Sequence, residues 1–572
     1  MTEGKWLVTV LRPLAPAFRR VLAVSFFVNC LGLAVPVFVL QVYDRVIYHA
    51  GMTTLQGLAL GMVAVLAFDY LLRQFRTRLT QSLALKIDVD AAGALVRKIA
   101  TLPLRALEAR PTVFWQAVFR DVETIRNTIA GPTALLVADL PFVAVFVVAI
   151  FVVAPPLGWV FTGIAGVMVC LSWYAGRALE KAGAEERIQA ARRDVLLGEM
   201  LAARGSVKAL DLSAALAPLW EDRHAGAVEA ALLRGRRNDR FVNLGLVLGM
   251  ASSVVLTTVG AVEIVGQQLS VGALVAANIL ASRLFAPLNQ LLGAWRQITA
   301  FRQATSRLND LMAEPEDISE QAVELAPPAG RLEAERVAFR FAPNDAPAIE
   351  GVSLTISPGG VTGILGRNGG GKTTLVKLLL GLYRPESGRV LLDGADVGQF
   401  TRGQLAAWIG YLPQETVLFS GTLRDNIAWG NPGCTDDEVI EAAERAGAHG
   451  FILDLPAGYG TVIGEGGTNL SPGMRQRIAL ARALAGAPPV VVLDEPSSWL
   501  DRQAEEALRA ALVSYAKEGR TVVVVTHSPL LLAACRDVVV IDKGRIAAAG
   551  PAPTVLPNLF AGTPAPQREV VA

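Results

Sequence analysis

The sequence is poor in charged side chains, which make up 18% of its 572 residues. Ordinary soluble domains carry about 25%. Hydrophobic residues make up 52%, and the mean hydropathy is +0.42. This composition excludes a disordered or collagen-like chain, and it argues against an enzyme that is soluble throughout, because too much apolar surface would face water. The apolar residues concentrate in the first half, which indicates a membrane part followed by a soluble part.

Net charge, a cleavable leader and paired cysteines are also lacking. The formal net charge is only +2, so no overall field favours nucleic acid as a partner. The first apolar run is not followed by a small-residue cleavage site, so no signal peptide is predicted. The four cysteines form no CxxC pair and predict neither a zinc site nor a disulfide framework: Cys30, Cys170, Cys434 and Cys535.

Six apolar runs are long enough to cross a bilayer, which takes about 20 residues in a helix. They predict a transmembrane domain over residues 21–312. Residues 1–20 are predicted to form an amphipathic helix on the membrane surface, although Pro13 and Pro16 interrupt it. The six runs are 21–43, 54–72, 133–154, 156–175, 241–265 and 272–296.

Two long connections carry most of the positive charge of this domain. Residues 73–129 hold ten Lys and Arg, and residues 176–240 hold twelve. The positive-inside rule places both segments in the cytoplasm, and an even number of spans places both termini there too. We expect the spans to continue into the cytoplasm as helices over 73–110 and 176–210. The turns at their tips are expected around 111–121 and 211–223.

Several polar side chains fall inside the predicted spans. A charge at the bilayer centre costs about 2.5–3.5 kcal/mol on insertion scales, so each such residue needs a reason. One hypothesis is a water-filled substrate path. The other is an internal ion pair, such as Arg283 with Asp139 or Glu263, that orders the bundle. The residues concerned are Asp69, Asp139, Glu263, Asn278 and Arg283.

The composition changes after residue 312. Residues 313–330 are acidic and contain prolines, which predicts a linker. Over residues 331–560, short apolar strands alternate with helical stretches, the pattern of a mostly parallel α/β domain. Residues 561–572 are expected to form a flexible tail.

A phosphate-binding loop opens the chemistry of this α/β domain. Residues 366–373 read GRNGGGKT and fit G-x-x-x-x-G-K-[ST], between the predicted strand 361–365 and a helical run. Glycines let the backbone approach phosphates, Lys372 would neutralise their charge, and Thr373 would bind Mg²⁺. The predicted ATP-binding residues here are Gly366, Arg367, Asn368, Gly369, Gly370, Gly371, Lys372, Thr373 and Thr374.

A second motif places two carboxylates at the end of a buried strand. Four apolar residues, 490–493, are followed by Asp494 and Glu495. Asp494 suits the Mg²⁺ shell, and Glu495 suits the polarisation of the water that attacks the γ-phosphate. Both motifs together predict a P-loop nucleotide hydrolase.

Residues 470–474 read Leu-Ser-Pro-Gly-Met and are followed by Arg-Gln-Arg. This segment resembles the LSGGQ signature of ATP-binding cassette (ABC) proteins. Further residues match the other motifs of that family: Phe341 (the aromatic residue that stacks on adenine), Gln414 (Q-loop), Asp501 (D-loop) and His527 (switch histidine).

The resemblance implies a head-to-tail dimer of cassettes, in which each ATP lies between the phosphate loop of one copy and the signature of the other. Ser471, Gly473 and Asp501 would then act in trans, at the ATP of the partner copy. Closure of the cassettes on ATP drives the membrane helices, and hydrolysis resets them. The residues implied are Glu495, His527 and Gln414 for catalysis, and Thr373, Gln414 and Asp494 for Mg²⁺.

The signature departs from the family pattern, since it reads LSPGM. Pro472 lacks an N–H, although proline is tolerated in the first turn of a helix. Met474 removes a side-chain amide that could touch the nucleotide. Weakened hydrolysis is therefore expected, unless a different partner chain supplies an intact signature. Homodimer and heterodimer both stay open, with a homodimer favoured.

Six spans ahead of one cassette resemble an ABC exporter half-transporter. Residues 40–46 (LQVYDRV), 119–127 (FRDVETIRN) and 464–467 (GEGG) further resemble the ATPase/permease of bacterial type I secretion systems. This resemblance implies an inner-membrane location, a periplasmic adaptor, an outer-membrane channel and an unfolded polypeptide as cargo. Since the first span is predicted to start near residue 21, no leader-peptidase domain is expected and the cargo would not be cleaved.

Three functions remain open from the sequence. The first is ATP-driven export of polypeptide. The second keeps the exporter but makes the cargo a lipid, a glycan or a small amphiphile. The third, prompted by LSPGM, is an ATP-sensing membrane regulator with weak hydrolysis. All three share one predicted fold class: a polytopic α-helical membrane domain of six spans fused to a cytosolic α/β P-loop nucleotide-binding domain.

Overall fold

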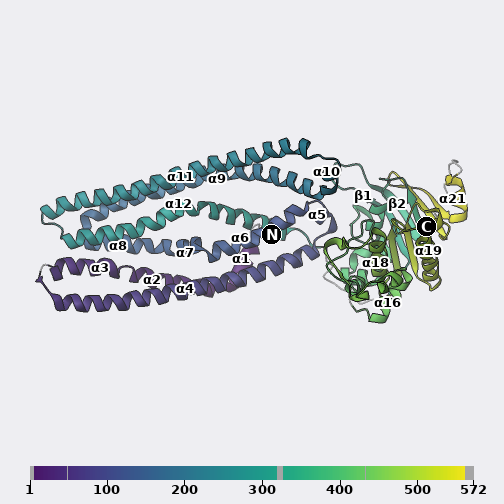
Figure 1. Ribbon diagram of the computed structural model, residues 1–572, viewed down its shortest axis with the longest axis horizontal. Coiled ribbons are helices and arrows are strands. Elements are labelled where there is room, and N and C mark those ends of the chain that lie inside the picture. Colours follow the sequence, from purple (N-terminus) through teal and green to yellow (C-terminus); the bar gives the residue numbers. More distant parts are fainter. Residues whose placement is uncertain (1–5, 48, 318–325, 432, 561–572) are drawn as a thin grey trace. The chain divides into compact units, whose positions relative to one another are not determined.

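The computed structural model describes residues 6–47, 49–317, 326–431 and 433–560 (Figure 1). The predicted tail, 561–572, lies outside the described residues, as do the first five residues of the predicted surface helix and residues 318–325 of the predicted linker. The chain divides into two compact units. The helical unit comprises Met1–Ala100 and Arg110–Glu314, and the α/β unit comprises Thr101–Ala109 and Pro315–Ala572.

The helical unit consists of long helices that lie side by side (Figure 1). Its longest helices have 48 to 53 residues. At 1.5 Å per residue, the 50 residues of α4 (Met52–Thr101) extend about 75 Å, far beyond the roughly 30 Å of a bilayer core. The other elements are α1 (Trp6–Leu11), α2 (Ala15–Leu31), α3 (Ala34–Gln41), η2 (Val42–Ile47), α6 (Thr112–Ala130), α7 (Pro132–Asp139), α8 (Val143–Val153), α9 (Pro155–Ala202), α10 (Arg204–Ala209), α11 (Ser213–Val265) and α12 (Val271–Ala313).

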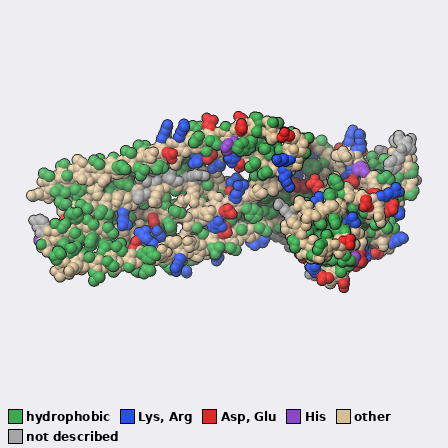
Figure 2. Space-filling model, in the orientation of Figure 1, with side chains coloured by type: hydrophobic (Ala, Val, Ile, Leu, Met, Phe, Trp, Pro, Cys, Tyr) green, Lys and Arg blue, Asp and Glu red, His purple; other side chains and the backbone are tan. Residues whose placement is uncertain are grey.

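Apolar side chains cover much of the helical unit in the view of Figure 2. Within the described residues, five helical stretches are long and apolar enough to cross a membrane. The predicted sixth span falls on α12, whose apolar stretch, Val271–Arg283, is shorter. The number of spans therefore stays a prediction. The five stretches are Trp6–Ile47, Met52–Thr101, Pro132–Val153, Pro155–Ala202 and Ser213–Val265.

Of the two predicted turns at the tips of the long helices, the first is wrong in position, and the second is right only at its start. Residues 111–121 lie almost wholly in α6, and residues 211–223 lie mostly in α11. The first break comes earlier, at Pro103, which has the extended ψ of 139° that ends a helix and precedes the short helix α5 (Leu104–Glu108). The second is made by Asp211, a non-glycine residue with a φ of 46°.

The predicted partner of Asp139 is also wrong. Its carboxylate accepts hydrogen bonds from Arg76 at 2.8 and 3.1 Å and from Asn29 at 3.0 Å, so Arg283 is not the cation that neutralises it. Arg76 is buried on α4 and also donates to Ser25 at 3.1 Å. Because Arg76 lies just beyond the predicted second span, the sequence did not mark it as a partner. The ion pair joins α2, α4 and the end of α7, which supports the ordering role over the substrate path for Asp139.

The LQVYDRV motif holds the start of α12. Asp44, in the π-helical turn η2, accepts hydrogen bonds from the Ser270 hydroxyl at 2.7 Å and from the Gly272 backbone N–H at 3.1 Å. A carboxylate at a helix N-terminus satisfies backbone donors that the helix leaves unpaired. A Cβ on Gly272 would lie 2.4 Å from the Asp44 carboxylate, so this approach needs glycine.

The α/β unit is built on a six-stranded sheet of order β12-β11-β3-β10-β9-β6. All neighbouring strands are parallel except β12, which pairs antiparallel with β11. A four-stranded antiparallel sheet, β2-β1-β4-β5, packs beside it in the same core. The strands are β1 (Leu332–Phe339), β2 (Ile349–Ile356), β3 (Gly360–Gly366), β4 (Ser387–Leu392), β5 (Ala395–Asp396), β6 (Ile409–Leu412), β9 (Val490–Asp494), β10 (Thr521–Val525), β11 (Asp537–Asp542) and β12 (Arg545–Pro551).

Both faces of the six-stranded sheet are buried, which explains why its strands are uninterrupted apolar runs. Val491 and Leu493 belong to one core cluster with the helices α15 to α19, whereas Val490 and Val492 belong to a second cluster with α13 and the four-stranded sheet. Because β3 and β9 both run parallel to β10, which lies between them, their carboxyl ends lie at the same edge of the sheet. The helices of this unit include α13 (Lys372–Leu379), α14 (Arg402–Trp408), α15 (Leu423–Ala428), α16 (Asp436–Arg445), α17 (His449–Leu453), α18 (Pro472–Leu484), α19 (Arg502–Lys517), α20 (Pro529–Leu532) and α21 (Ala552–Phe560).

Candidate nucleotide-binding site

The phosphate loop lies between the end of β3 and the start of α13. Gly369 and Gly371 have φ values of 75° and 102°, a region that side chains other than glycine rarely adopt. A Cβ on Gly366 would lie 2.1 Å from the Ile541 carbonyl oxygen. These glycines let the loop turn tightly ahead of α13, so the free N–H groups of the helix start face an open space suited to an anion.

Lys372 turns back over the loop that precedes it. Its Nζ donates to the carbonyl oxygens of Gly366 at 2.8 Å and Arg367 at 3.2 Å, and the residue is buried. The ammonium group is thus held by the backbone of the loop at the place where phosphate oxygens would bind. This position agrees with the predicted role in neutralising phosphate charge.

A hydroxyl and a carboxylate meet next to the loop. The Thr373 hydroxyl donates to the Asp494 carboxylate at 2.9 Å. Burial raises the pKa of Asp494, and the Thr373 hydrogen bond opposes that rise. A hydroxyl oxygen and a buried carboxylate are the hard oxygen ligands that Mg²⁺ prefers, so the two residues fit the predicted metal role.

Glu495 follows Asp494 and lies beside His527, with 3.6 Å between a carboxylate oxygen and Nε2. Burial raises the pKa of Glu495, and the charge of His527 is the largest opposing cause. The Glu495 backbone has a φ of 51°, uncommon for a residue other than glycine. A partly buried carboxylate with a raised pKa, next to a histidine, suits a group that orients and activates water.

Phe341 lies just after β1, with its ring edge-on to Phe339 and Tyr383. The side chain is half exposed, so one ring face is open for stacking on a base. Its carbonyl oxygen accepts a hydrogen bond from Arg105 of α5 at 2.6 Å. The aromatic residue predicted to stack on adenine is therefore anchored through its backbone.

The residues predicted to bind ATP and Mg²⁺ within one copy line a single cavity of about 370 Å³, with two exceptions. The exceptions are Gly366 and Arg367, whose carbonyl oxygens hold Lys372. The lining residues are Phe341, Ala348, Asn368, Gly369, Gly370, Gly371, Lys372, Thr373, Thr374, Gln414, Asp494 and Glu495.

The residues predicted to act in trans lie elsewhere in the α/β unit. Ser471 is the N-cap of α18, and Asp501 is the N-cap of α19. Gly473 packs against the Trp499 backbone, where a Cβ would lie 2.8 Å from the carbonyl oxygen. Since these residues line no part of the cavity of their own chain, their predicted contact with a partner's ATP stays a prediction.

The unusual signature fits the helix that it begins. Pro472 takes the first helical position of α18, where its missing N–H has no intrahelical partner to lose. The Ser471 hydroxyl accepts a hydrogen bond from the Met474 backbone N–H at 3.3 Å, which caps the helix. The Met474 side chain packs against the core of the unit. LSPGM therefore preserves the helix start, while the lost amide remains the only chemical departure at position 474.

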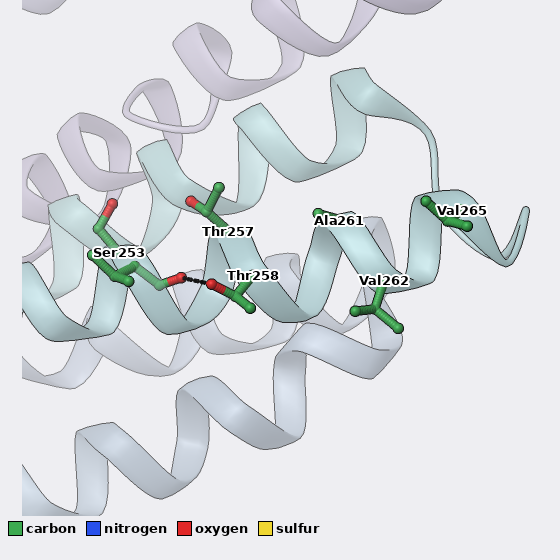
Figure 3. Close-up of a pocket in the computed structure, with 7 residues that line it drawn as sticks. Ser253, Thr257, Thr258, Ala261, Val262 and Val265 are labelled. Carbon is green, nitrogen blue, oxygen red and sulfur yellow. Dashed lines mark hydrogen bonds between the residues drawn. The ribbon is translucent and has the colours of Figure 1, made fainter.

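One pocket of the helical unit lies apart from the nucleotide site. It has a volume of about 730 Å³ and follows one face of α11, as Figure 3 shows. No charged residue is among its lining residues, and the Thr258 hydroxyl is satisfied within the helix by the Val254 carbonyl at 2.8 Å. The lining residues are Ser253, Val254, Thr257, Thr258, Ala261, Val262 and Val265.

Sequence reasoning missed two polar side chains, Gln476 and Thr416, that are hydrogen-bonded next to the site but do not line the cavity. Gln476 donates to the backbone of Glu495 and Pro496, and Thr416 donates to Gln476. The signal for Gln476 was its place in the Arg-Gln-Arg run directly after the LSPGM signature. Ala348, which lines the cavity, gave no signal because alanine carries no functional group.

A phosphate loop joined to a buried Thr–Asp pair, with a glutamate and a histidine beside it, defines a P-loop ATPase. This ATPase is fused to a helical unit with stretches of membrane-spanning length. Two family models match the two parts: "ABC transporter transmembrane region" over residues 20–288 and "ABC transporter" over residues 349–498. The chain belongs to the ABC transporter family. A third model, an AAA domain with the description "putative AbiEii toxin, Type IV TA system", matches residues 466–533.

Curated relatives cover nearly the whole chain. The cyclolysin secretion/processing ATP-binding protein CyaB of Bordetella pertussis is 33% identical over 559 residues, which are 97% of this chain and 78% of that protein. The leukotoxin export ATP-binding protein LtxB of Aggregatibacter actinomycetemcomitans is 31% identical, over 95% and 76%. The alpha-hemolysin translocation ATP-binding protein HlyB of Escherichia coli is 30% identical, over 95% and 77%.

The fold has a close counterpart among solved structures. A bacterial Atm1-family ABC exporter with ATP bound matches with a TM-score of 0.84 and 23% identity, over 97% of this chain and 98% of that one. The predicted fold class is confirmed: a transmembrane exporter domain is joined to an α/β nucleotide-binding domain. The chain is a membrane-embedded ATP hydrolase that couples hydrolysis to export.

Proposed function

We propose that this chain is the ATPase/permease of a type I secretion system and exports an unfolded polypeptide. The observation that carries this proposal is the 33% identity over 97% of the chain to a protein named for cyclolysin secretion. The sequence motifs LQVYDRV and FRDVETIRN point the same way. A periplasmic adaptor and an outer-membrane channel are the proposed partners, and the bacterial inner membrane is the proposed location, with both termini and the ATPase domain in the cytoplasm.

The proposed domain order is that of the sequence analysis: a surface helix over residues 1–20, six spans within 21–312, a linker over 313–330 and the cassette over 331–560. Two copies of the chain form the transporter, and each contributes one half of each ATP site. Ser471, Gly473 and Asp501 of one copy contact the ATP held by the phosphate loop of the other.

Residues in and beside the cavity have proposed roles in hydrolysis. Lys372 and the N–H groups at the start of α13 bind the β- and γ-phosphates. Thr373, Asp494 and Gln414 hold Mg²⁺, which when bound would neutralise charge on the phosphates. Glu495 orients the attacking water, and His527 lies beside it to stabilise the charge that develops. Phosphoryl transfer depends mainly on such positioning and charge neutralisation.

Hydrolysis is expected to depend on pH through Glu495. The carboxylate must be ionised to accept a proton from the attacking water, and burial raises its pKa. The turnover number should therefore fall, as pH is lowered, at a pH above the usual glutamate value of about 4.3. Because His527 lowers the pKa of Glu495, His527→Ala should move this acid limb to higher pH. Turnover at saturating ATP, measured from pH 5 to 8 for both proteins, checks the direction; a limb that moves to lower pH contradicts it.

Secretion by the source bacterium tests the proposed cargo. Deletion of the coding sequence should remove at least one polypeptide from the culture medium, and the wild-type chain should restore it. A Lys372→Met chain, produced at equal level in the membrane, should not. An unchanged set of secreted proteins, together with an altered lipid or glycan profile of the envelope, would replace polypeptide with one of those cargoes.

A further inference from the structure

One buried side chain outside the cavity contacts two segments of the site at once. Gln476 lies on α18, one turn beyond the signature, and only 1% of it is exposed. Its Nε2 donates to the carbonyl oxygens of Glu495 at 3.4 Å and Pro496 at 3.3 Å. Its Oε1 accepts a hydrogen bond from the Thr416 hydroxyl at 3.3 Å. Both ends of the amide are thus used, and a buried amide with all partners present specifies one arrangement of the groups around it.

The backbone to which Gln476 donates its hydrogen bonds is strained at Glu495. The φ of 51° at Glu495 places a non-glycine residue in the left-handed region. Such a conformation persists only where the surroundings over-determine it, and it clusters at functional sites. Two backbone hydrogen bonds contribute: the Glu495 N–H donates to Val525 at 2.9 Å, and its carbonyl oxygen accepts from Ser498 at 3.2 Å. Gln476 supplies the restraint that comes from a side chain.

The other end of the amide holds the segment that follows Gln414. Thr416 lies two residues after Gln414, and the next residue, Val417, is also bound to α18, since its carbonyl oxygen accepts from Arg482 at 3.0 Å. Helix α18 therefore anchors this segment at two successive residues. Ser471 caps the start of the same helix, and Gln476 on this helix donates a hydrogen bond to the Glu495 carbonyl oxygen. The signature, the Glu495 backbone and the segment after Gln414 are therefore all joined to α18.

We propose that Gln476 is a positioning residue for ATP hydrolysis, which fixes the backbone at Glu495 and ties it to the segment after Gln414. The inference rests on the proposed role of Glu495 in activating water. Through Gln476, the position of α18 determines where the Glu495 carboxylate lies. A displacement of α18 at Ser471, or of the segment at Thr416, would thus reach the attacking water without any contact between Gln476 and ATP.

The test uses the full-length protein in lipid nanodiscs and separates positioning from folding. Gln476→Met keeps the length of the side chain and removes both polar ends. We expect its turnover number to fall about 10-fold when these three hydrogen bonds are lost, with the dissociation constant of ATP within about 2-fold of wild type. Thr416→Val should lower turnover about 3-fold, whereas Thr416→Ser, which keeps the hydroxyl, should not. The double variant should be no slower than Gln476→Met alone, since both changes break one network.

A matched control and a reference variant complete the design. Thr461→Val removes a comparable hydroxyl, whose bond goes to the Gly458 carbonyl, and should leave turnover unchanged. Wild-type turnover in Gln476→Met would overturn the proposal. So would a loss of turnover that is matched by a loss of ATP affinity or a lower unfolding temperature, with Thr416→Val and Thr416→Ser equally slow. Glu495→Gln is measured alongside. If Glu495→Gln hydrolyses ATP normally, the proposed role of Glu495 fails; if it is inactive while Gln476→Met is normal, only the inference fails.

Discussion

Glu495→Gln is expected to lower ATP turnover about 10³-fold while leaving ATP binding intact, the range found when a general base is removed. Glutamine has the same shape as glutamate, so the backbone at Glu495 and its contact with Gln476 are preserved. The amide cannot accept a proton from the attacking water. Because ATP still binds and is no longer consumed, the variant should accumulate in the ATP-bound state, and export should stop.

Turnover and bound nucleotide are both measured on the full-length protein in nanodiscs with Mg-ATP. Glu506→Gln is the matched control, since Glu506 is an exposed glutamate on α19 that pairs with Arg502 at 3.3 Å. It should hydrolyse ATP as the wild type does. Continued export by Glu495→Gln at the wild-type rate would reject the assignment of Glu495.

Lys372→Met is expected to weaken ATP binding about 100-fold. The ammonium group is the positive charge held at the phosphate loop by the carbonyl oxygens of Gly366 and Arg367, and hydrogen bonds to charged groups contribute about 1.5–3 kcal/mol each. Methionine keeps the length of the side chain and removes the charge.

Calorimetric titration of the full-length protein with ATP checks the affinity, and the unfolding temperature checks the fold. Lys377→Met is the control, because Lys377 lies on the same helix but pairs with Glu108 at 2.8 Å and does not line the cavity. An unchanged affinity in Lys372→Met, or an equal loss in both variants, would show that the phosphate loop is not where ATP binds.

Much of the nucleotide site could be predicted because its chemistry is carried by residues that are close in sequence. A phosphate loop needs a strand, glycines with positive φ and a helix start, and all of these lie within residues 361–374. Asp494 and Glu495 could be paired with the loop because parallel strands bring their carboxyl ends to one edge. The structure joins Thr373 to Asp494 across 121 positions of the chain, as that rule requires.

Contacts that depend on packing between distant segments could not be predicted. Arg76 neutralises Asp139. It lies on α4 just beyond the end of the predicted second span, and no hydrophobic periodicity indicates such a pair. Gln476 is recognisable as a polar residue next to the signature. Its hydrogen-bond partners, however, come from residues 416, 495 and 496, which are distant in sequence. The first turn was misplaced because the helix already breaks at Pro103 and a new helix starts after Pro111, whereas the range predicted for the second turn begins at the actual break, Asp211.

The proposed arrangement places each ATP between the phosphate loop of one chain and the signature of another. It is tested most directly by ATP turnover in mixed dimers of two inactive variants, Lys372→Met and Ser471→Asn, purified through a different tag on each chain. Asparagine keeps the N-cap of α18 and adds bulk where the partner's ATP would lie. One site of the mixed dimer then carries both changes and the other carries none, so turnover should return toward half the wild-type value. If the mixed dimer stays as inactive as its two parents, the shared site is contradicted.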